Sequence, residues 1–197
     1  MCALHLSQIR LKDSSCAVVL RDGLRAQILL GVSSTYEVTS HAISAGRSLK
    51  EQIDNYAFGD VVDLEEVASE GRFLPPITHP DPARWYLSGT GMTHLGSASA
   101  RHLMHAKSDP DEMTDSMKMF RMGIEGGRPT SGRIGVQPEW FYKGNGHCVV
   151  APGAPLVSPS FALDAGEEAE IAGIYLIDDN GMPVRLGFTL ANEFSDH

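Results

Sequence analysis

Glu168 and Glu170 stand one residue apart, directly before the apolar run of residues 171–177. The run is short and rich in β-branched residues, which favours a strand over a helix. Alternate side chains of a strand lie on the same face, so we expect the two carboxylates to point the same way. Residues 171–177 are apolar on both faces of that strand, which predicts that the strand is buried.

Two carboxylates on the same face at the start of a buried strand would repel each other and lose hydration. The loss of hydration costs several kcal/mol for each uncompensated ion. A divalent cation relieves both penalties, because hard cations prefer carboxylate oxygens as ligands. Glu168 and Glu170 are therefore candidate ligands of a metal ion. The alternative is an exposed strand start at which both acids lie in water.

The composition is that of an ordinary globular protein, with 42% hydrophobic and 21% charged residues among 197. A net charge of −9 and the lack of a Lys/Arg cluster argue against nucleic acid or an anionic membrane as the partner. No apolar stretch has the length of a membrane span, and the N-terminus lacks the features of a signal peptide. Cys2, Cys16 and Cys148 are odd in number and widely spaced, which suggests neither a disulfide framework nor a zinc site. These features predict a cytoplasmic, reduced protein.

A proline-rich segment divides the sequence. Four prolines lie within residues 75–82, where they forbid helix and interior strand. The segment is predicted to be a linker or a rigid extended crossing. We place the domain boundary there, which gives an N-terminal α+β domain over residues 1–75 and a second domain over residues 76–197.

The two domains are expected to contain short strands and a few helices. In the first we expect strands over residues 16–20 and 26–30 around the turn signal Asp22-Gly23, a helix capped by Ser33, Ser34 or Thr35, and a second helix from near Ser48. In the second we expect strands over residues 84–89, 139–143, 147–150 and 171–177, a helix over 97–106, and a hairpin that turns at 178–181 into a strand over 184–190.

Three separated motifs carry a resemblance to a known family. They are Gly89-Thr90-Gly91-Met92-Thr93-His94, the pair Glu168 and Glu170, and Ala191-Asn192-Glu193-Phe194-Ser195. In order and content they resemble the fumarylacetoacetate hydrolase superfamily, whose active site joins a Glu-x-Glu strand, a later acid in an Asn-Asp-x-Ser-like motif, and an upstream His after a Gly-rich strand end. Phe141-Tyr142-Lys143-Gly144 resembles the family's Phe-x-Lys stretch, and the match covers about residues 84–197.

The resemblance implies a role for each matching residue. Glu168, Glu170 and Glu193 look like the ligands of Mg²⁺ (or Mn²⁺ or Ca²⁺), with Glu193 where many relatives have Asp. His94 looks like the general base, which suits a group that titrates near neutrality, and Lys143 is the second catalytic candidate. Thr93, Ser97, Asn192, Ser195 and His197 are candidate substrate-binding residues, with helix and turn capping as the alternative for each.

Two departures from the family pattern point to one of its branches. Ser97 stands where many relatives have a Glu, and His197 stands where an arginine often binds substrate. Together with LSGTGMTHLGSA and NEFSDH, these changes resemble the branch associated with bacterial sugar-acid catabolism. The resemblance therefore implies a small-molecule 2-keto acid as the substrate.

The resemblance also implies a fold and an assembly. The expected fold is α+β and mostly β, in which the N-terminal α+β domain precedes an incomplete mixed β-sheet core of the β-roll kind. Relatives continue beyond the position of His197, so we expect either a truncated chain or completion by another chain. Relatives also form dimers, which makes a homodimer the expected assembly.

The leading hypothesis is a divalent-metal-dependent hydrolase or dehydratase that acts on a 2-keto-3-deoxy or 2,4-diketo sugar acid. Hydrolytic C–C cleavage and dehydration share the same enolate chemistry, and the sequence does not separate them. One alternative is a catalytically silent metal-binding fragment of such an enzyme. Another is a non-catalytic sugar- or acid-binding β module, in which the acids serve solubility.

Overall fold

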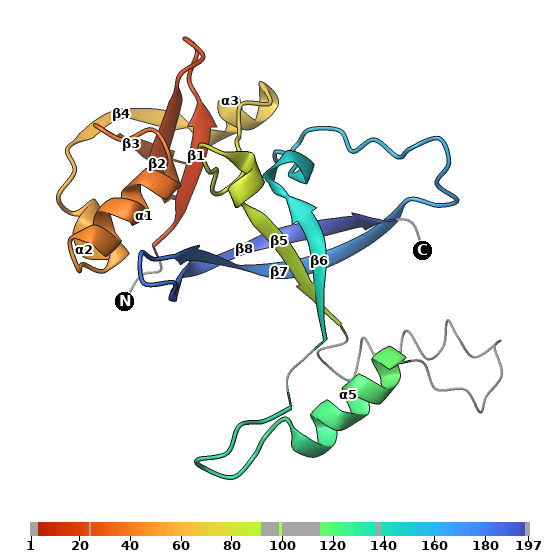
Figure 1. The fold of residues 1–197 in the computed structure, drawn as a ribbon. Coiled ribbons are helices and arrows are strands. Elements are labelled where there is room, and N and C mark those ends of the chain that lie inside the picture. Colours follow the sequence, from red (N-terminus) through yellow and green to blue (C-terminus); the bar gives the residue numbers. More distant parts are fainter. Residues whose placement is uncertain (1–3, 24, 92–98, 100–114, 137–138, 196–197) are drawn as a thin grey trace. The chain divides into compact units, whose positions relative to one another are not determined.

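The computed structural model describes residues 4–23, 25–91, 99, 115–136 and 139–195 (Figure 1). By its internal contacts the chain separates into two units, Met1–Pro80 with Val149–His197 and Asp81–Cys148. Across the described residues it is an α+β protein with small antiparallel sheets. The finer expectation of an incomplete β-roll core stays a prediction. None of the described helices has the length and apolarity needed to cross a membrane.

The N-terminal region forms a four-stranded antiparallel sheet. Its strands are β1 (Leu6–Arg10), β2 (Cys16–Asp22), β3 (Arg25–Leu29) and β4 (Phe58–Asp63), in the order β1-β2-β3-β4. The turn between β2 and β3 contains Gly23 with a φ of 60°, a conformation that glycine adopts without strain. The hairpin expected around Asp22-Gly23 is therefore confirmed, whereas the sequence analysis missed β1 and β4.

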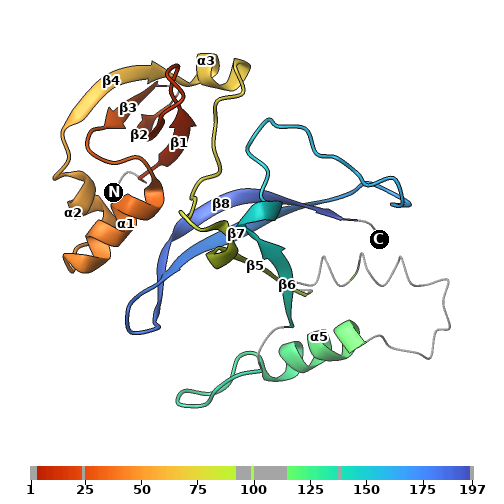
Figure 2. The ribbon, with the colours of Figure 1, turned by 45° about the horizontal axis from the view of Figure 1, so that its top comes forward.

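Three helices accompany this sheet (Figure 2). They are α1 (Thr35–Ser44), α2 (Leu49–Ile53) and α3 (Leu64–Ser69). The Ser34 side chain caps α1 by accepting a hydrogen bond from the Glu37 backbone N–H, and Ser48 forms a reciprocal capping box with Glu51. Both predicted helix starts are confirmed, because the capping signals are local in sequence.

Alternation along β2 divides the core of the sheet into two clusters, one on each face. The first cluster consists of Ile9, Ala17, Val19, Ala26, Leu64 and Val67. The second consists of Val18, Leu29, Val38 and Ile53. Successive side chains of a strand point to opposite faces, so Val18 and Val19 enter different clusters. Leu64 and Val67 of α3 cover one face, while Val38 of α1 and Ile53 of α2 cover the other.

The proline-rich segment is fastened to the N-terminal sheet through a buried glutamine. Gln8 Nε2 donates to the Pro75 carbonyl at 2.7 Å, and Gln8 Oε1 accepts from the Thr35 N–H at 2.7 Å. The Thr35 hydroxyl donates to the Pro76 carbonyl at 2.6 Å. These hydrogen bonds hold Pro75 and Pro76 against the N-terminal region, because a proline carbonyl can still accept a hydrogen bond.

The unit Asp81–Cys148 contains a two-stranded antiparallel sheet of β5 (Tyr86–Thr90) and β6 (Trp140–Asn145). It also contains the 3₁₀ turns η1 (Pro82–Arg84) and η2 (Gly146–Cys148), and helix α5 (Asp115–Gly126). The strands predicted over residues 84–89 and 139–143 are confirmed with small shifts of their ends. The helix predicted over residues 97–106 lies outside the described residues, apart from residue 99.

The prediction of a strand over residues 147–150 is wrong. Its first two residues belong to η2, and Asn145 Oδ1 accepts a hydrogen bond from the His147 backbone N–H at 3.1 Å. Gly144, with a φ of 127°, bends the chain just before this turn. The side-chain hydrogen bond offers the backbone an alternative to strand pairing, as asparagine does in many turns.

The glutamates lie on a long antiparallel hairpin of β7 (Gly166–Ile177) and β8 (Pro183–Ser195). Its turn is closed by Asp178, whose Oδ1 accepts hydrogen bonds from the backbone N–H groups of Met182 and Asn180. The Met182 hydrogen bond is the main cause that lowers the pKa of Asp178 below its ordinary value. The hairpin predicted at residues 178–181 is confirmed.

The prediction that the glutamate strand is buried on both faces is wrong. β7 pairs with β8 alone among the described strands, and Ile171, Tyr175 and Ile177 are exposed on one face of the hairpin. The apolar pattern indicated residues suited to burial, but burial needs a neighbouring layer that a strand's own sequence does not specify. Glu168 and Glu170 are exposed as well.

Candidate metal centre

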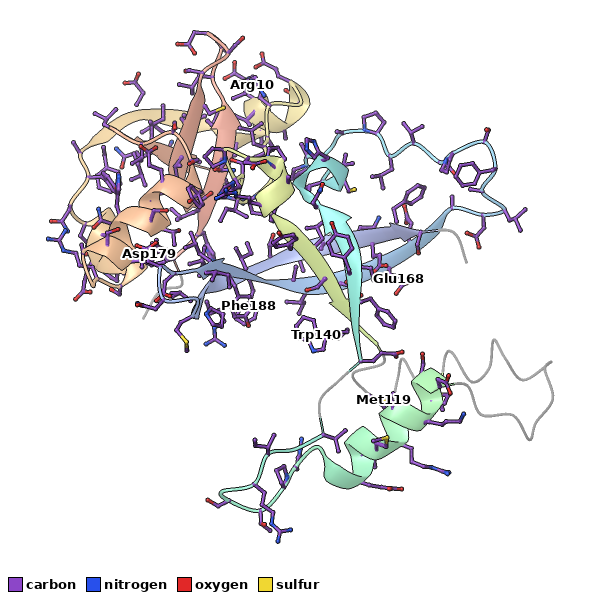
Figure 3. All side chains as sticks on the ribbon, viewed as in Figure 1. Arg10, Met119, Trp140, Glu168, Asp179 and Phe188 are labelled. Carbon is purple, nitrogen blue, oxygen red and sulfur yellow. The ribbon has the colours of Figure 1, made fainter. Side chains whose placement is uncertain are left out.

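The pairing of β7 with β8 brings the three predicted ligands together. Glu168 lies directly opposite Glu193, and Glu170 lies opposite Ala191. Residues opposite each other across an antiparallel pair share a face, and so do residues two apart on one strand. All three glutamates therefore point to the same face of the hairpin. Figure 3 labels Glu168 on this hairpin.

The three carboxylates are close enough to share one ion. One carboxylate oxygen from each of Glu168, Glu170 and Glu193 lies within 4.8 Å of the other two. Two oxygens on opposite sides of one cation lie at most about 4.2 Å apart for Mg²⁺ and about 5 Å apart for Ca²⁺. The spacing therefore allows the three carboxylates to share one divalent cation.

The exposure of the site changes the electrostatic argument. Glu168 and Glu170 are exposed and Glu193 is half-buried, so water screens their repulsion and hydrates them without a cation. The burial penalty expected from the sequence is therefore absent. The three converging carboxylates still repel one another, and a divalent cation would neutralise that repulsion. Their ligand atoms are all oxygens, which hard divalent cations prefer.

A β-bulge sets the register that creates this cluster. Tyr175 pairs with Arg185 but Ile174 pairs with Gly187, so Leu186 is an extra residue in β8. Continued without the bulge, the pairing would place Asn192 opposite Glu168 and turn Glu193 to the other face. A slip of one residue moves a side chain across the sheet, so the bulge decides whether a third carboxylate reaches the site.

Deletion of Leu186 is expected to keep the three-carboxylate site, because it removes the unpaired residue and leaves Glu193 opposite Glu168 in a ladder without a bulge. Isothermal titration with Mn²⁺ should therefore show similar binding to the wild-type chain and to the deletion variant. Leu186→Ala keeps the bulge and should also bind as the wild type does. Loss of Mn²⁺ binding in the deletion variant would contradict this register.

Asn192 supports the site from the neighbouring position of β8. Its Oδ1 accepts a hydrogen bond from the Glu168 backbone N–H at 3.1 Å, which ties the two strands together beside the carboxylates. The family resemblance suggested a substrate contact for Asn192 and did not reveal this hydrogen bond, which depends on the register. Ser195 lies two residues after Glu193, half-buried and on the same face.

Of the other predicted site residues, Lys143 alone lies in the part of the chain that the structure describes. Lys143 lies on β6 in the unit Asp81–Cys148, where its Nζ is 5.2 Å from the centre of the Phe141 ring. His94, Thr93, Ser97 and His197 lie outside the described residues. The hairpin therefore brings Glu168, Glu170, Glu193 and Ser195 to one face, while Asn192, which alternates to the other face, bonds the Glu168 backbone.

Comparisons with known proteins give no relative: neither a family model, nor a curated protein, nor a solved structure matches this chain. The assignment of a function therefore depends on the residues and geometry given above.

Proposed function

We propose that this protein is a divalent-metal-dependent hydrolase or dehydratase that acts on a 2-keto-3-deoxy or 2,4-diketo sugar acid. One observation carries the metal part of the proposal: Glu168, Glu170 and Glu193 converge within 4.8 Å although Glu193 belongs to a different strand. The same three residues match the metal ligands of the fumarylacetoacetate hydrolase superfamily, which the motifs of the chain resemble.

The ligand set suits a cation that leaves room for a substrate. Three carboxylates occupy part of the coordination shell of Mg²⁺, Mn²⁺ or Ca²⁺, and Mg²⁺ ordinarily keeps several waters that a keto acid can replace. When bound, such a cation supplies Lewis-acid chemistry, which polarises a carbonyl and stabilises negative charge that develops next to it. This chemistry serves both hydrolytic C–C cleavage and dehydration.

The chain's own residues supply binding and proton transfer in this proposal. Ser195 lies on the carboxylate face and can offer its hydroxyl to a substrate oxygen there. Asn192 holds the Glu168 backbone and so keeps one ligand in place. By resemblance, His94 takes the proton or activates water, with Lys143 as the second catalytic group. Thr93, Ser97 and His197 complete the proposed set of polar contacts to the hydroxyls of a sugar acid.

The substrate assignment is tested by comparing kcat/KM for three compounds in the presence of Mg²⁺. A 2-keto-3-deoxy sugar acid is expected to be turned over at least about tenfold more efficiently than fumarylacetoacetate or a simple acylpyruvate. The reason is that a pocket built to hydrogen-bond hydroxyls strongly rejects substrates that lack them. Preference for either of the latter compounds would contradict the sugar-acid assignment and leave the metal site standing.

A direct titration separates this proposal from its alternatives. Mn²⁺ binding with turnover supports the enzyme. Mn²⁺ binding without turnover of any of the three compounds supports a catalytically silent metal-binding fragment. Failure to bind Mg²⁺, Mn²⁺ or Ca²⁺ at millimolar concentration contradicts both and favours a binding module whose acids serve solubility.

A further inference from the structure

Lys143 occupies a β-bulge in β6. Ser88 pairs with Tyr142 and Leu87 pairs with Gly144, so Lys143 is the extra residue on its strand. Gly144 follows with a φ of 127°, a conformation that glycine adopts without strain. Bulges redirect a side chain and are common next to active sites. The bulge therefore gives Lys143 a backbone position that regular pairing would not provide.

The Phe141 ring faces the Lys143 ammonium. The Lys143 Nζ lies 5.2 Å from the centre of the ring, within the distance of about 6 Å over which an aromatic face attracts a cation. Phe141 is 38% exposed, against 63% for Trp140 and 68% for Tyr142. Figure 3 labels Trp140, the first residue of β6. The least exposed of these three neighbouring aromatic residues is thus the one that contacts the cation.

Phe141 and Tyr142 lie on opposite faces of the β5–β6 sheet. Phe141 pairs with Gly89 and Tyr142 pairs with Ser88, and neighbouring residues of a strand alternate between the two faces. The Tyr142 ring contacts the Tyr86 ring edge to face, with 6.4 Å between the two centres. The two adjacent aromatic residues therefore have different partners, which allows their effects to be separated by mutation.

The contact with Phe141 restrains a side chain that can otherwise sample many rotamers. Lysine carries a compact charge on a flexible four-carbon stem. Reaction rates fall steeply when a reacting group is displaced by about 1 Å. A ring on one side of the ammonium favours one position of the charge, and the N–H groups that point away from the ring can still donate to a substrate oxygen.

We propose that Phe141 is a positioning residue, which holds the Lys143 ammonium in place for its part in the reaction. The inference rests on the proposed function, in which Lys143 is the second catalytic group, and it adds a residue that acts only through Lys143. The attraction between a cation and a ring at an exposed position corresponds to a change in rate of about two- to fivefold.

The position of Lys143 is measured by NMR, independently of activity. Reductive methylation with isotope-labelled formaldehyde labels each lysine and keeps its positive charge. The ring current of Phe141 is expected to shift the methyl signal of Lys143 upfield, and Lys143→Arg identifies this signal by removing it. Phe141→Leu is expected to abolish the upfield shift, because leucine has no ring. Phe141→Tyr and the control Tyr142→Leu are expected to keep it.

Steady-state kinetics tests the role in the reaction, with Mg²⁺ and a 2-keto-3-deoxy sugar acid as the substrate. Phe141→Leu is expected to lower kcat about two- to fivefold and to leave KM unchanged, which is the mark of an interaction that acts in the transition state. Phe141→Tyr restores the ring and is expected to restore kcat. Tyr142→Leu is expected to change neither constant. Circular dichroism shows whether each variant is folded.

The outcomes separate this inference from the proposed function. A Lys143 signal that Phe141→Leu does not move would overturn the inference, whatever the activity. A kcat that falls equally in Phe141→Leu and Tyr142→Leu, or that Phe141→Tyr does not restore, would also overturn it, because a purely structural effect gives that result. If the signal is shifted but the wild-type chain turns over no substrate, the proposed function fails, and the role of Phe141 in the reaction fails with it.

Discussion

Glu170→Gln is expected to weaken Mn²⁺ binding at least about a hundredfold, because it removes one of three charged ligands while keeping the size of the side chain. Mutation of a residue that only supports a metal ligand typically lowers metal affinity roughly 10–100-fold, so removal of a direct ligand should lower it at least as much. Isothermal titration measures this change. Glu167→Gln is the matched control, since Glu167 adjoins the cluster on β7 but points to the opposite face.

Thermal unfolding gives an independent reading of the same variants. A cation that binds only the folded chain raises the unfolding temperature as its concentration rises above the dissociation constant. This gain should disappear in Glu170→Gln. Without a cation the same variant should be slightly more stable than the wild type, because it removes repulsion between neighbouring carboxylates. A loss of stability in metal-free buffer, or an equal loss of Mn²⁺ affinity in Glu167→Gln, would contradict the proposed site.

Gln8→Met is expected to lower the free energy of unfolding of the N-terminal region by about 2–4 kcal/mol, because it leaves buried polar groups without partners. Gln8 is 1% exposed, and its carboxamide bonds the Thr35 N–H and the Pro75 carbonyl. Methionine has a similar length, so the substitution removes the hydrogen bonds with little change in volume. Urea denaturation followed by circular dichroism measures the change.

The control for this prediction is Gln27→Met, at an exposed position of β3. A surface substitution of this kind is expected to change the free energy of unfolding by no more than about 0.5 kcal/mol. Equal effects of the two substitutions would show that the hydrogen bonds of Gln8 do not fasten the proline-rich segment. Increased proteolysis near Pro75 in Gln8→Met would support the fastening directly.

Features that depend on near neighbours in the chain can be predicted from the sequence alone. Capping by Ser34 and Ser48, the hairpin around Gly23 and the turn that Asp178 closes all follow from a few adjacent residues. The common face of Glu168 and Glu170 follows from the two-residue period of a strand, which holds whatever the strand packs against.

Features that depend on partners far away in the chain become visible in the folded protein. The extra residue Leu186 fixes the register that places Glu193 opposite Glu168, and an apolar pattern alone does not reveal a bulge. The burial of Gln8 depends on a segment 67 residues away in the chain. The exposure of β7 likewise depends on how many strands pair with it and which layers pack on its two faces. Residue type records suitability for burial, whereas burial itself is a property of the neighbours that folding brings into contact.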